Sequence, residues 1–305
     1  MIGFPGLVPP KRAFEVLWSG DKYPARGTKE TARTMTTPPR DWTELHWPTI
    51  GTSEAARWIA VLPLAATEQH GPHLPVSTDI YIAEAYLGRV RALLPPTLPV
   101  TFLPLQPVGI STEHIDYPGT LSLPTEVALR SWRALGDSVA RAGLRKLVIV
   151  TSHGGNSAAM TLVAQDLRAT FRMLVVTTSW ARFGVPDGLF SADELRHGIH
   201  GGAVETSIMQ ACHPELVRGE ASANFASSGA EIEKNNRVLS TQRPAPMAWQ
   251  TQDLNASGAV GDATQASAGK GAHVLEHGAR AFCALLQDID NFDVNTLGGG
   301  PLASR

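Results

Sequence analysis

Two carboxylates and two imidazoles lie within the segment TEQHGPHLPVSTD, residues 67 to 79. The segment follows the apolar run WIAVLPLAA, which is typical of a buried strand. In extended backbone, residues at i and i+2 point the same way, so Glu68 and His70 can act on one small volume. Asp79 comes just before a helix that we expect from Ile80. It is either the helix N-cap or is directed back toward the strand end, where a carboxylate can bridge two cations.

Two further segments carry the same kinds of side chain. TSHGGN follows the apolar run KLVIV, so His153 leaves a strand end into a glycine turn and Asn156 caps the next helix. HGGAVETS sets His200 and Glu205 around another glycine pair, at what reads as a helix start. Together the segments supply the oxygen and nitrogen donors that suit zinc, manganese or iron(II). We therefore predict a paired-metal hydrolytic site, because two cations about 3.5–4 Å apart acidify a shared water and polarise a carbonyl.

Other polar and aromatic residues are candidates for substrate contacts. We predict that Glu113, His114 and Trp180 line the substrate pocket, with a structural turn and a core position as the respective alternatives. His73 is expected either beside the metal ligands or on the surface, rather than among the ligands. The remaining histidines considered lack supporting neighbours and are interpreted as structural: His197, His213, His273 and His277.

Short apolar runs alternate with longer amphipathic stretches along most of the chain. The predicted strands cover residues 58–65, 100–108, 146–152 and 173–180, and the predicted helices cover 80–94, 124–143, 156–171 and 203–216. This alternation favours an α/β layered domain with a mainly parallel sheet, because each helix supplies a crossover. Polar segments from 219 to 271 indicate loops, and a final helix is expected at 272–288. In open α/β sheets, sites form at the carboxyl ends of strands, which is where the motifs fall.

Composition excludes several classes of function. The chain has 305 residues, of which 43% are hydrophobic, and its 26 basic and 28 acidic residues give a net charge of −2. We therefore expect neither nucleic acid nor a membrane as a partner. Cys212 and Cys283 are far apart without CxxC spacing, which argues against a disulfide framework or a cysteine zinc site. No apolar run reaches the roughly 20 residues of a bilayer span, and prolines interrupt the N-terminal stretch, so we expect a cytoplasmic protein.

We predict three parts along the chain. Residues 1–45, rich in Pro, Gly, Thr and Arg, are expected to form an extended arm. Residues 46–292 form the hydrolase domain, and residues 293–305 form a flexible tail.

The ordered motifs resemble those of the creatininase (creatinine amidohydrolase) family. STEHIDYPGTLSLP at 111–124 and GAVGDATQASAGKG at 258–271 extend the likeness to about residues 55–290. The resemblance implies a single three-layer α/β/α domain, a metal-dependent hydrolase of cyclic or linear C–N bonds, and a homo-oligomer, either a hexamer or a trimer of dimers. It also implies two divalent ions per subunit (Zn, Mn or Fe). The site residues that it assigns are a metal set of Glu68, His70, Asp79, His153 and Glu205, with Asp79 bridging, and a catalytic pair of His200 and Glu205.

One position departs from creatininase itself. Gly155 stands where creatininase has a glutamate ligand, whereas HGGN also occurs in relatives such as formamide hydrolases and the mycofactocin-maturation peptidase. The gap leaves either a metal position completed by water or Glu205 as a direct ligand.

Our hypothesis is an amidohydrolase that acts on a small molecule with a non-peptide, possibly cyclic, amide. A metal-bound hydroxide attacks the carbonyl, and His200 passes a proton to the departing nitrogen. The alternatives are a formamide hydrolase, a peptide-processing member, or a non-catalytic metal-binding or small-molecule-binding homologue. A dinuclear phosphoesterase is disfavoured, because the site motifs contain no Lys or Arg.

Overall fold

A parallel sheet forms the centre of the computed structural model, which describes residues 37–52 and 54–300. Within these residues the sheet has four strands in the order β2-β1-β3-β4. The strands are β1 (Ile59–Leu64), β2 (Val100–Phe102), β3 (Lys146–Thr151) and β4 (Leu174–Ser179). Three helices make the crossovers between consecutive strands, namely α1 (Thr78–Leu93), α2 (Thr125–Arg141) and α3 (Ser157–Phe171). The predicted α/β fold with a mainly parallel sheet is confirmed.

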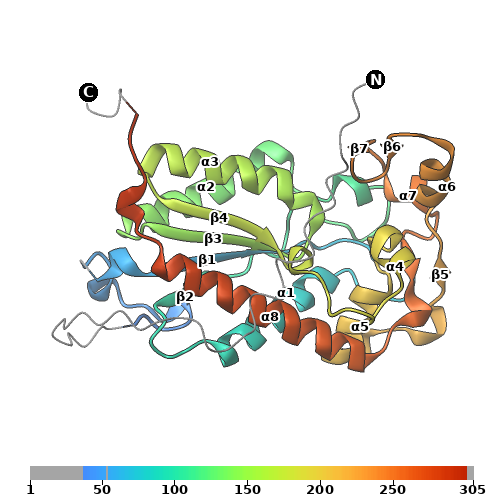
Figure 1. Ribbon diagram of the computed structural model, residues 1–305, viewed down its shortest axis with the longest axis horizontal. Helices are drawn as coiled ribbons and strands as arrows, with labels where there is room; N and C mark the ends of the chain where they lie inside the picture. The colour runs from blue at the N-terminus through green and yellow to red at the C-terminus, as the bar shows by residue number, and fades with distance from the viewer. Residues whose placement is uncertain (1–36, 53, 301–305) are drawn as a thin grey trace, which may run out of the picture. The chain divides into compact units, whose positions relative to one another are not determined.

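Helices cover both faces of this sheet (Figure 1). α2 and α3 lie on one face, while α1, α5 (Ala203–Cys212) and α8 (Ala268–Asn291) lie on the other. Alternation along β1 explains the two cores, because Ile59 and Val61 join the cluster on the α1 and α8 side and Leu62 joins the cluster on the α2 and α3 side. Burying one such side chain contributes about 1.5–3 kcal/mol. The three-layer prediction is therefore confirmed.

The last helix is longer than the predicted span of 272–288. It begins after Ser267, whose hydroxyl accepts a hydrogen bond from the backbone N–H of Lys270, and it ends at Asn291. A small residue on its inner face permits close packing, because a Cβ at Gly271 would lie 1.9 Å from the Ser207 carbonyl oxygen of α5. The extra N-terminal turn thus packs against α5, which begins within the HGGAVETS motif.

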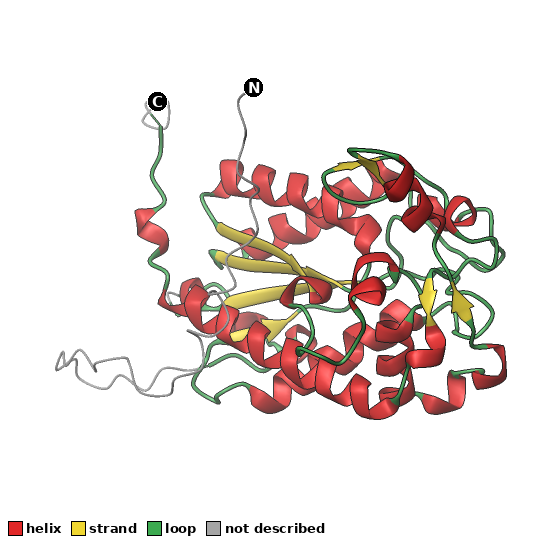
Figure 2. Cartoon of the chain, turned by 45° about the vertical axis from the view of Figure 1, so that its right-hand side comes forward, coloured by secondary structure: helices red, strands yellow, loops and turns green. Residues whose placement is uncertain are grey.

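Short elements gather at the carboxyl end of the sheet (Figure 2). They fall in the segment predicted as loops and in the region just before it, so the loops contain brief ordered pieces. The helices are α4 (Ala192–His197), α6 (Ser228–Asn235) and α7 (Thr251–Leu254). The strand pairs are β5 (Asn224–Phe225) with β8 (Gly261–Asp262), and β6 (Leu239–Ser240) with β7 (Ala245–Pro246).

Segments flanking the domain also make ordered contacts. The backbone N–H of Phe102 donates to the Arg40 carbonyl oxygen at 2.7 Å, and the Arg40 guanidinium donates to the carbonyl oxygen of Leu98 at 2.7 Å. The last part of the predicted arm therefore covers the β2 edge, while residues 1–36 lie outside the described residues. In the predicted tail, Asn295 accepts from Arg145 at 3.4 Å, and residues 301–305 lie outside the described residues. No helix in the described part of the chain is long and apolar enough to cross a bilayer.

Candidate metal centre

Strand register brings the first and second motifs together. β1 and β3 are parallel neighbours in which Leu64 pairs with Thr151. Glu68 and His153 therefore leave the same edge of the sheet. The chain after Glu68 returns toward it, because the backbone N–H of Glu68 donates to the Val76 carbonyl oxygen at 2.9 Å, and this turn leads into α1.

Backbone carbonyls fix the orientation of three buried imidazoles. His153 Nε2 lies 2.7 Å from the Ile110 oxygen, His70 Nδ1 lies 3.0 Å from the Glu68 backbone oxygen, and His200 Nε2 lies 2.7 Å from the Gln69 backbone oxygen. A carbonyl oxygen only accepts, so each of these nitrogens carries the proton. In the neutral ring, the other nitrogen consequently presents a lone pair to the interior of the site.

These lone pairs face carboxylate oxygens. His153 Nδ1 lies 3.1 Å from Glu68 Oε1 and 3.4 Å from Asp79 Oδ2. His70 Nε2 lies 3.9 Å from Asp79 Oδ1 and 3.8 Å from Glu205 Oε2. A lone pair that faces an anionic oxygen is unfavourable unless a cation lies between the two. The arrangement is therefore that of a ligand set for cations.

Unsatisfied atoms support the same conclusion. Among the described residues, Glu68 Oε2, His70 Nε2 and Asp79 Oδ2 are buried without a hydrogen-bond partner. The described residues contain three sets of three residues in which the ligand atoms of each set lie within 4.8 Å of one another. Two of these sets share Asp79. The sets are Glu68, Asp79 and His153; His70, Asp79 and Glu205; and Glu68, His70 and His200. Buried oxygen and nitrogen donors of this kind fit a zinc-like or manganese-like ion.

The three buried histidines of the cluster differ in the direction of their pKa shifts. Burial lowers the pKa of His153, but the carboxylates of Glu68 and Asp79 outweigh it and raise that pKa well above its usual value. The pKa of His70 is raised for the same reason, with burial opposed by Asp79 and Glu205. Burial and the neighbouring rings of His70 and His114 hold the pKa of His200 well below its usual value.

Glu205 occupies the first turn of α5 with a perturbed carboxyl group. Burial, reinforced by Asp79 and partly opposed by His70, raises its pKa to about 7. Its Oε2 accepts a hydrogen bond of 2.6 Å from the backbone N–H of Gly201, which adopts φ +62°. The glycine turn therefore aims the carboxylate at the cluster, and Glu205 is a candidate ligand as well as a candidate proton acceptor.

Gly155 leaves space that Glu113 fills. A Cβ at Gly155 would lie 2.6 Å from Glu113 Oε1, 2.4 Å from His153 Nε2 and 2.5 Å from the Ile110 carbonyl oxygen. Glu113 Oε1 itself lies 3.6 Å from His153 Nε2, and burial raises the pKa of this carboxyl group. Glu113, predicted to contact substrate, thus borders the ligand set on the side where the sequence lacks a side chain.

His114 also joins the cluster. Its Nε2 lies 3.5 Å from Glu68 Oε1, and its ring stacks on that of His200 with centroids 4.1 Å apart. Burial lowers the pKa of His114 to about 4. His114 thus lies beside the ligand set. Its contact with a substrate stays a prediction.

Trp180 lies elsewhere, and its predicted place on the pocket wall is corrected. Its side chain is 3% exposed and belongs to the apolar core between the sheet and α1 and α8. The indole stacks on Tyr86 with centroids 4.5 Å apart and also contacts Phe282. The sequence alone allows an aromatic residue at a strand end to lie either in the core or on a pocket wall. Here the apolar faces of α1 and α8 hold the indole in the core.

Two buried residues, His73 and Glu194, hydrogen-bond to the segment that carries His200 and Glu205. His73 Nε2 lies 3.0 Å from the Gly201 carbonyl oxygen and 3.0 Å from Thr206 Oγ1, as expected for a residue that braces the site. Glu194 is 3% exposed and was missed by the sequence analysis. Its carboxylate accepts from the backbone N–H groups of Ala203 at 2.6 Å and Asp262 at 2.8 Å.

The glycines that surround Glu194 are the sequence feature from which its buried position could have been predicted. A Cβ at Gly198, Gly202 or Gly261 would lie within 3.0 Å of the Glu194 carboxylate. The four histidines interpreted as structural belong to none of the ligand sets. His213 contacts Glu215 and the Tyr81 ring, His273 contacts the Gly269 carbonyl, and His277 contacts the Phe183 carbonyl, while Nδ1 of His197 is buried without a hydrogen-bond partner among the described residues.

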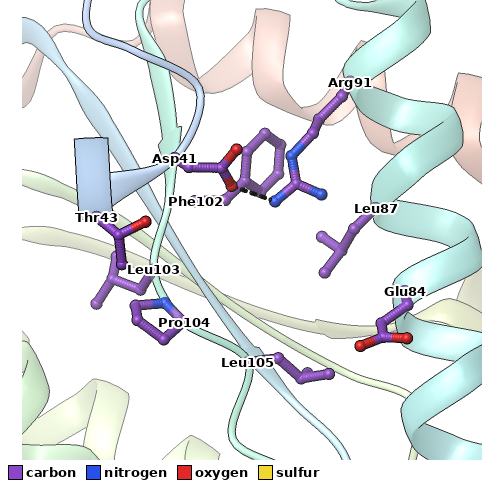
Figure 3. A pocket seen from close by; sticks show the side chains of 9 residues that line it. All are labelled: Asp41, Thr43, Glu84, Leu87, Arg91, Phe102, Leu103, Pro104 and Leu105. Carbon is purple, nitrogen blue, oxygen red and sulfur yellow. Dashed lines mark hydrogen bonds and ion pairs between the residues drawn. The ribbon is translucent and has the colours of Figure 1, made fainter. Parts of the chain in front are cut away.

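A separate pocket lies at the β2 edge (Figure 3). It has a volume of about 230 Å³. Arg91 crosses it to form an ion pair of 2.6 Å with Asp41 and lies over the Phe102 ring at 4.6 Å. Its lining shares no residue with the metal-ligand sets, so we do not assign the chemistry of the chain to it.

The fold and the cluster define an α/β protein with a candidate metal site at the carboxyl end of its parallel sheet. A profile of the creatininase family, described as creatinine amidohydrolase, matches residues 43–286. The mycofactocin precursor peptide peptidase of Mycobacterium tuberculosis is 32% identical over 223 residues, which cover 71% of this chain and 76% of that protein. The chain therefore belongs to the creatininase family, a family of hydrolases.

Solved structures agree with this assignment at the level of the fold. A creatinine amidohydrolase (creatininase) has a TM-score of 0.67 at 24% identity, over 83% of this chain and 99% of that one. A manganese creatininase has a TM-score of 0.65 at 23% identity, over 82% and 98%. A mutant creatininase of Zn–Zn type has a TM-score of 0.66 at 22% identity, over 83% and 98%.

Proposed function

We propose that the chain is a metal-dependent amidohydrolase that binds two divalent ions through a shared Asp79 and cleaves a linear amide of peptide type. One observation carries the two-ion assignment. The two oxygens of Asp79 face different imidazole lone pairs, Oδ1 toward His70 Nε2 and Oδ2 toward His153 Nδ1. A buried carboxylate that faces two nitrogen lone pairs in this way is suited to bridge two ions.

The chain's own residues have distinct tasks in this proposal. Glu68 and His153 would hold one ion together with Asp79, and His70 and Glu205 would hold the other with the same carboxylate. Divalent ions supply an acidified water and polarise the substrate carbonyl.

His200 and Glu205 are the candidates for moving protons. His200 presents an unprotonated Nδ1 at 3.7 Å from Glu68 Oε1, where it would take a proton from the attacking water and pass it to the departing nitrogen as the C–N bond breaks. Glu205 is an alternative proton carrier only if it does not hold the second ion, because its pKa of about 7 belongs to the metal-free chain and a bound cation would lower it.

The preference for a linear amide replaces the narrower expectation of a non-peptide, possibly cyclic substrate. The M. tuberculosis relative at 32% identity is named a peptide peptidase, while the creatininase structures at 22–24% identity support the fold alone. Gly155 also removes the glutamate by which creatininase differs from the HGGN relatives. Both observations favour a peptide or a related open-chain amide over creatinine.

A substrate panel tests this proposal. Protein loaded with Mn or Zn is incubated with short peptides, formamides, lactams and creatinine, and the carboxylic acid product of each compound is quantified by mass spectrometry. We expect turnover of at least one peptide or open-chain amide, lost on chelation and restored by the metal. Creatinine cleaved as fast as the best compound would overturn the substrate class. If the protein binds metal but cleaves none of the panel, the result supports the alternative of a non-catalytic metal-binding homologue.

A further inference from the structure

We propose that Gln69 is a positioning residue that holds the imidazoles of His114 and His200 in opposite hydrogen-bonding roles, His114 as an N–H donor and His200 as an acceptor. Both rings face one oxygen. His114 Nε2 lies 3.5 Å and His200 Nδ1 lies 3.7 Å from Glu68 Oε1. What each ring offers at that point depends on which of its nitrogens carries the proton.

The orientation of the Gln69 amide is fixed by backbone groups of known polarity. Its Oε1 accepts from the N–H of Gly71 at 2.8 Å, and its Nε2 donates to the carbonyl oxygen of Gly258 at 2.8 Å. Reversing the amide would place two donors together at Gly71 and two acceptors together at Gly258. The nitrogen of the amide therefore points away from Gly71 and toward His114.

The fixed amide determines the tautomer of His114. Gln69 Nε2 lies 2.8 Å from His114 Nδ1, and an amide nitrogen only donates, so Nδ1 accepts. Thr251 Oγ1 also lies 2.8 Å from that Nδ1 and 3.0 Å from the Glu113 carbonyl oxygen. A hydroxyl can donate to either group or accept from the ring, so Thr251 fits both tautomers and does not decide between them. The Glu68 carboxylate oxygen, 3.5 Å from Nε2, favours a proton on Nε2 as the Gln69 amide does. With Nδ1 as an acceptor, the ring carries its proton on Nε2 and directs an N–H group toward Glu68.

The main chain of the same residue determines the tautomer of His200. The Gln69 carbonyl oxygen lies 2.7 Å from His200 Nε2, whereas the Gln69 amide nitrogen lies 3.4 Å from the same atom and already has partners for its two hydrogens in His114 and Gly258. His200 Nε2 therefore donates to the carbonyl, which leaves Nδ1 with a lone pair. One residue thus prepares a donor and an acceptor on two stacked rings. His114 is then excluded as a metal ligand through Nε2 and is free to donate to Glu68 or to an acceptor oxygen of a bound ligand.

This assignment has a consequence for recognition that rests on the proposed function. A substrate carbonyl or carboxylate oxygen is a suitable partner for the His114 N–H group, whereas a substrate N–H group at the same place is not. The tautomers themselves do not depend on any catalytic activity.

Nitrogen NMR of the metal-free protein tests the proposal. Histidine is labelled with ¹⁵N, and the His114 signals are identified by their loss in His114→Gln. We expect the wild-type His114 signals to show a proton on Nε2 and none on Nδ1. A proton on Nδ1 in the wild type would overturn the proposal.

Two variants separate positioning by Gln69 from a general structural role. Gln69→Glu keeps the size of the side chain but places an acceptor opposite His114, so we expect a proton to appear on Nδ1. Thr251→Val removes the other polar neighbour and should leave the wild-type pattern unchanged. If the Gln69→Glu pattern equals the wild type, or if Thr251→Val alone moves the proton to Nδ1, Gln69 does not set the tautomer. If Gln69→Glu does not fold, Gln69→Met takes its place: it removes the amide N–H group opposite His114 Nδ1, and an unchanged wild-type pattern in that variant overturns the proposal. A failed substrate panel leaves this outcome unaffected.

Discussion

The Glu113 carboxylate lies 3.6 Å from Nε2 of His153 and occupies the space into which a side chain at residue 155 would extend. The two positions are therefore coupled, because any Cβ at 155 meets the carboxylate, the imidazole and the rigid carbonyl of Ile110. Packing therefore requires glycine at position 155, where creatininase has a glutamate.

Gly155→Ala should destabilise the fold. A Cβ at 2.5 Å from a backbone oxygen cannot be accommodated by rotating a side chain, and we expect a loss of about 1–3 kcal/mol in the free energy of unfolding. Chemical denaturation measures it. Gly154→Ala is the matched control, since a Cβ at Gly154 has nothing within 4 Å. Equal stability of the two variants would contradict the predicted close contact.

Metal affinity should rise with pH. The pKa values of His70 and His153 are raised, so below them each ring holds a proton on the nitrogen that would bind the ion. Raising the pH removes these protons and ionises Glu205, whose pKa is about 7. Calorimetry in buffers of different ionisation enthalpy should show proton release on Zn or Mn binding. Constant affinity from about pH 6 to 8, the range around an ordinary histidine pKa, would contradict this expectation.

Asp79→Asn should lose metal without losing the fold. The variant removes the oxygen pair shared by two ligand sets, so we expect less metal per chain by elemental analysis. Wild-type protein at about 100 times the metal Kd should gain about 2.7 kcal/mol of stability from the ion, and the variant should gain much less. Asp187→Asn is the control, because Asp187 is exposed and belongs to none of the ligand sets. Full metal content in Asp79→Asn would refute the bridging role.

Glu194→Gln should destabilise the turn that carries His200 and Glu205. The buried carboxylate accepts from two backbone N–H groups, and an amide would replace one acceptor with a donor, at a cost of about 1–3 kcal/mol. Asp193→Asn, one residue earlier and exposed, should change stability little. Denaturation curves of the pair give the comparison, and indistinguishable curves would refute the predicted role of Glu194.

Local signals were sufficient to predict the strand ends and most of the candidate cluster. Glu68 and His153 follow apolar runs directly, and parallel strands carry their following residues to one edge of the sheet. The role of Gln69 was not predictable in this way, because its partners come from distant segments at 114, 200 and 258. Trp180 was misplaced because an aromatic residue after a strand has no local feature that distinguishes core from pocket. The oligomeric assembly stays a prediction.

The hydrogen bonds of His70, His153 and His200 to backbone carbonyls form within the chain itself. These side chains consequently lose their rotamer freedom when the protein folds and not when an ion arrives. Binding an ion then avoids an ordering entropy of about 0.5–1.5 kcal/mol for each side chain. Different divalent ions meet the same prearranged donors, so the choice among them is left to preferred geometry and to the supply of metal in the cell.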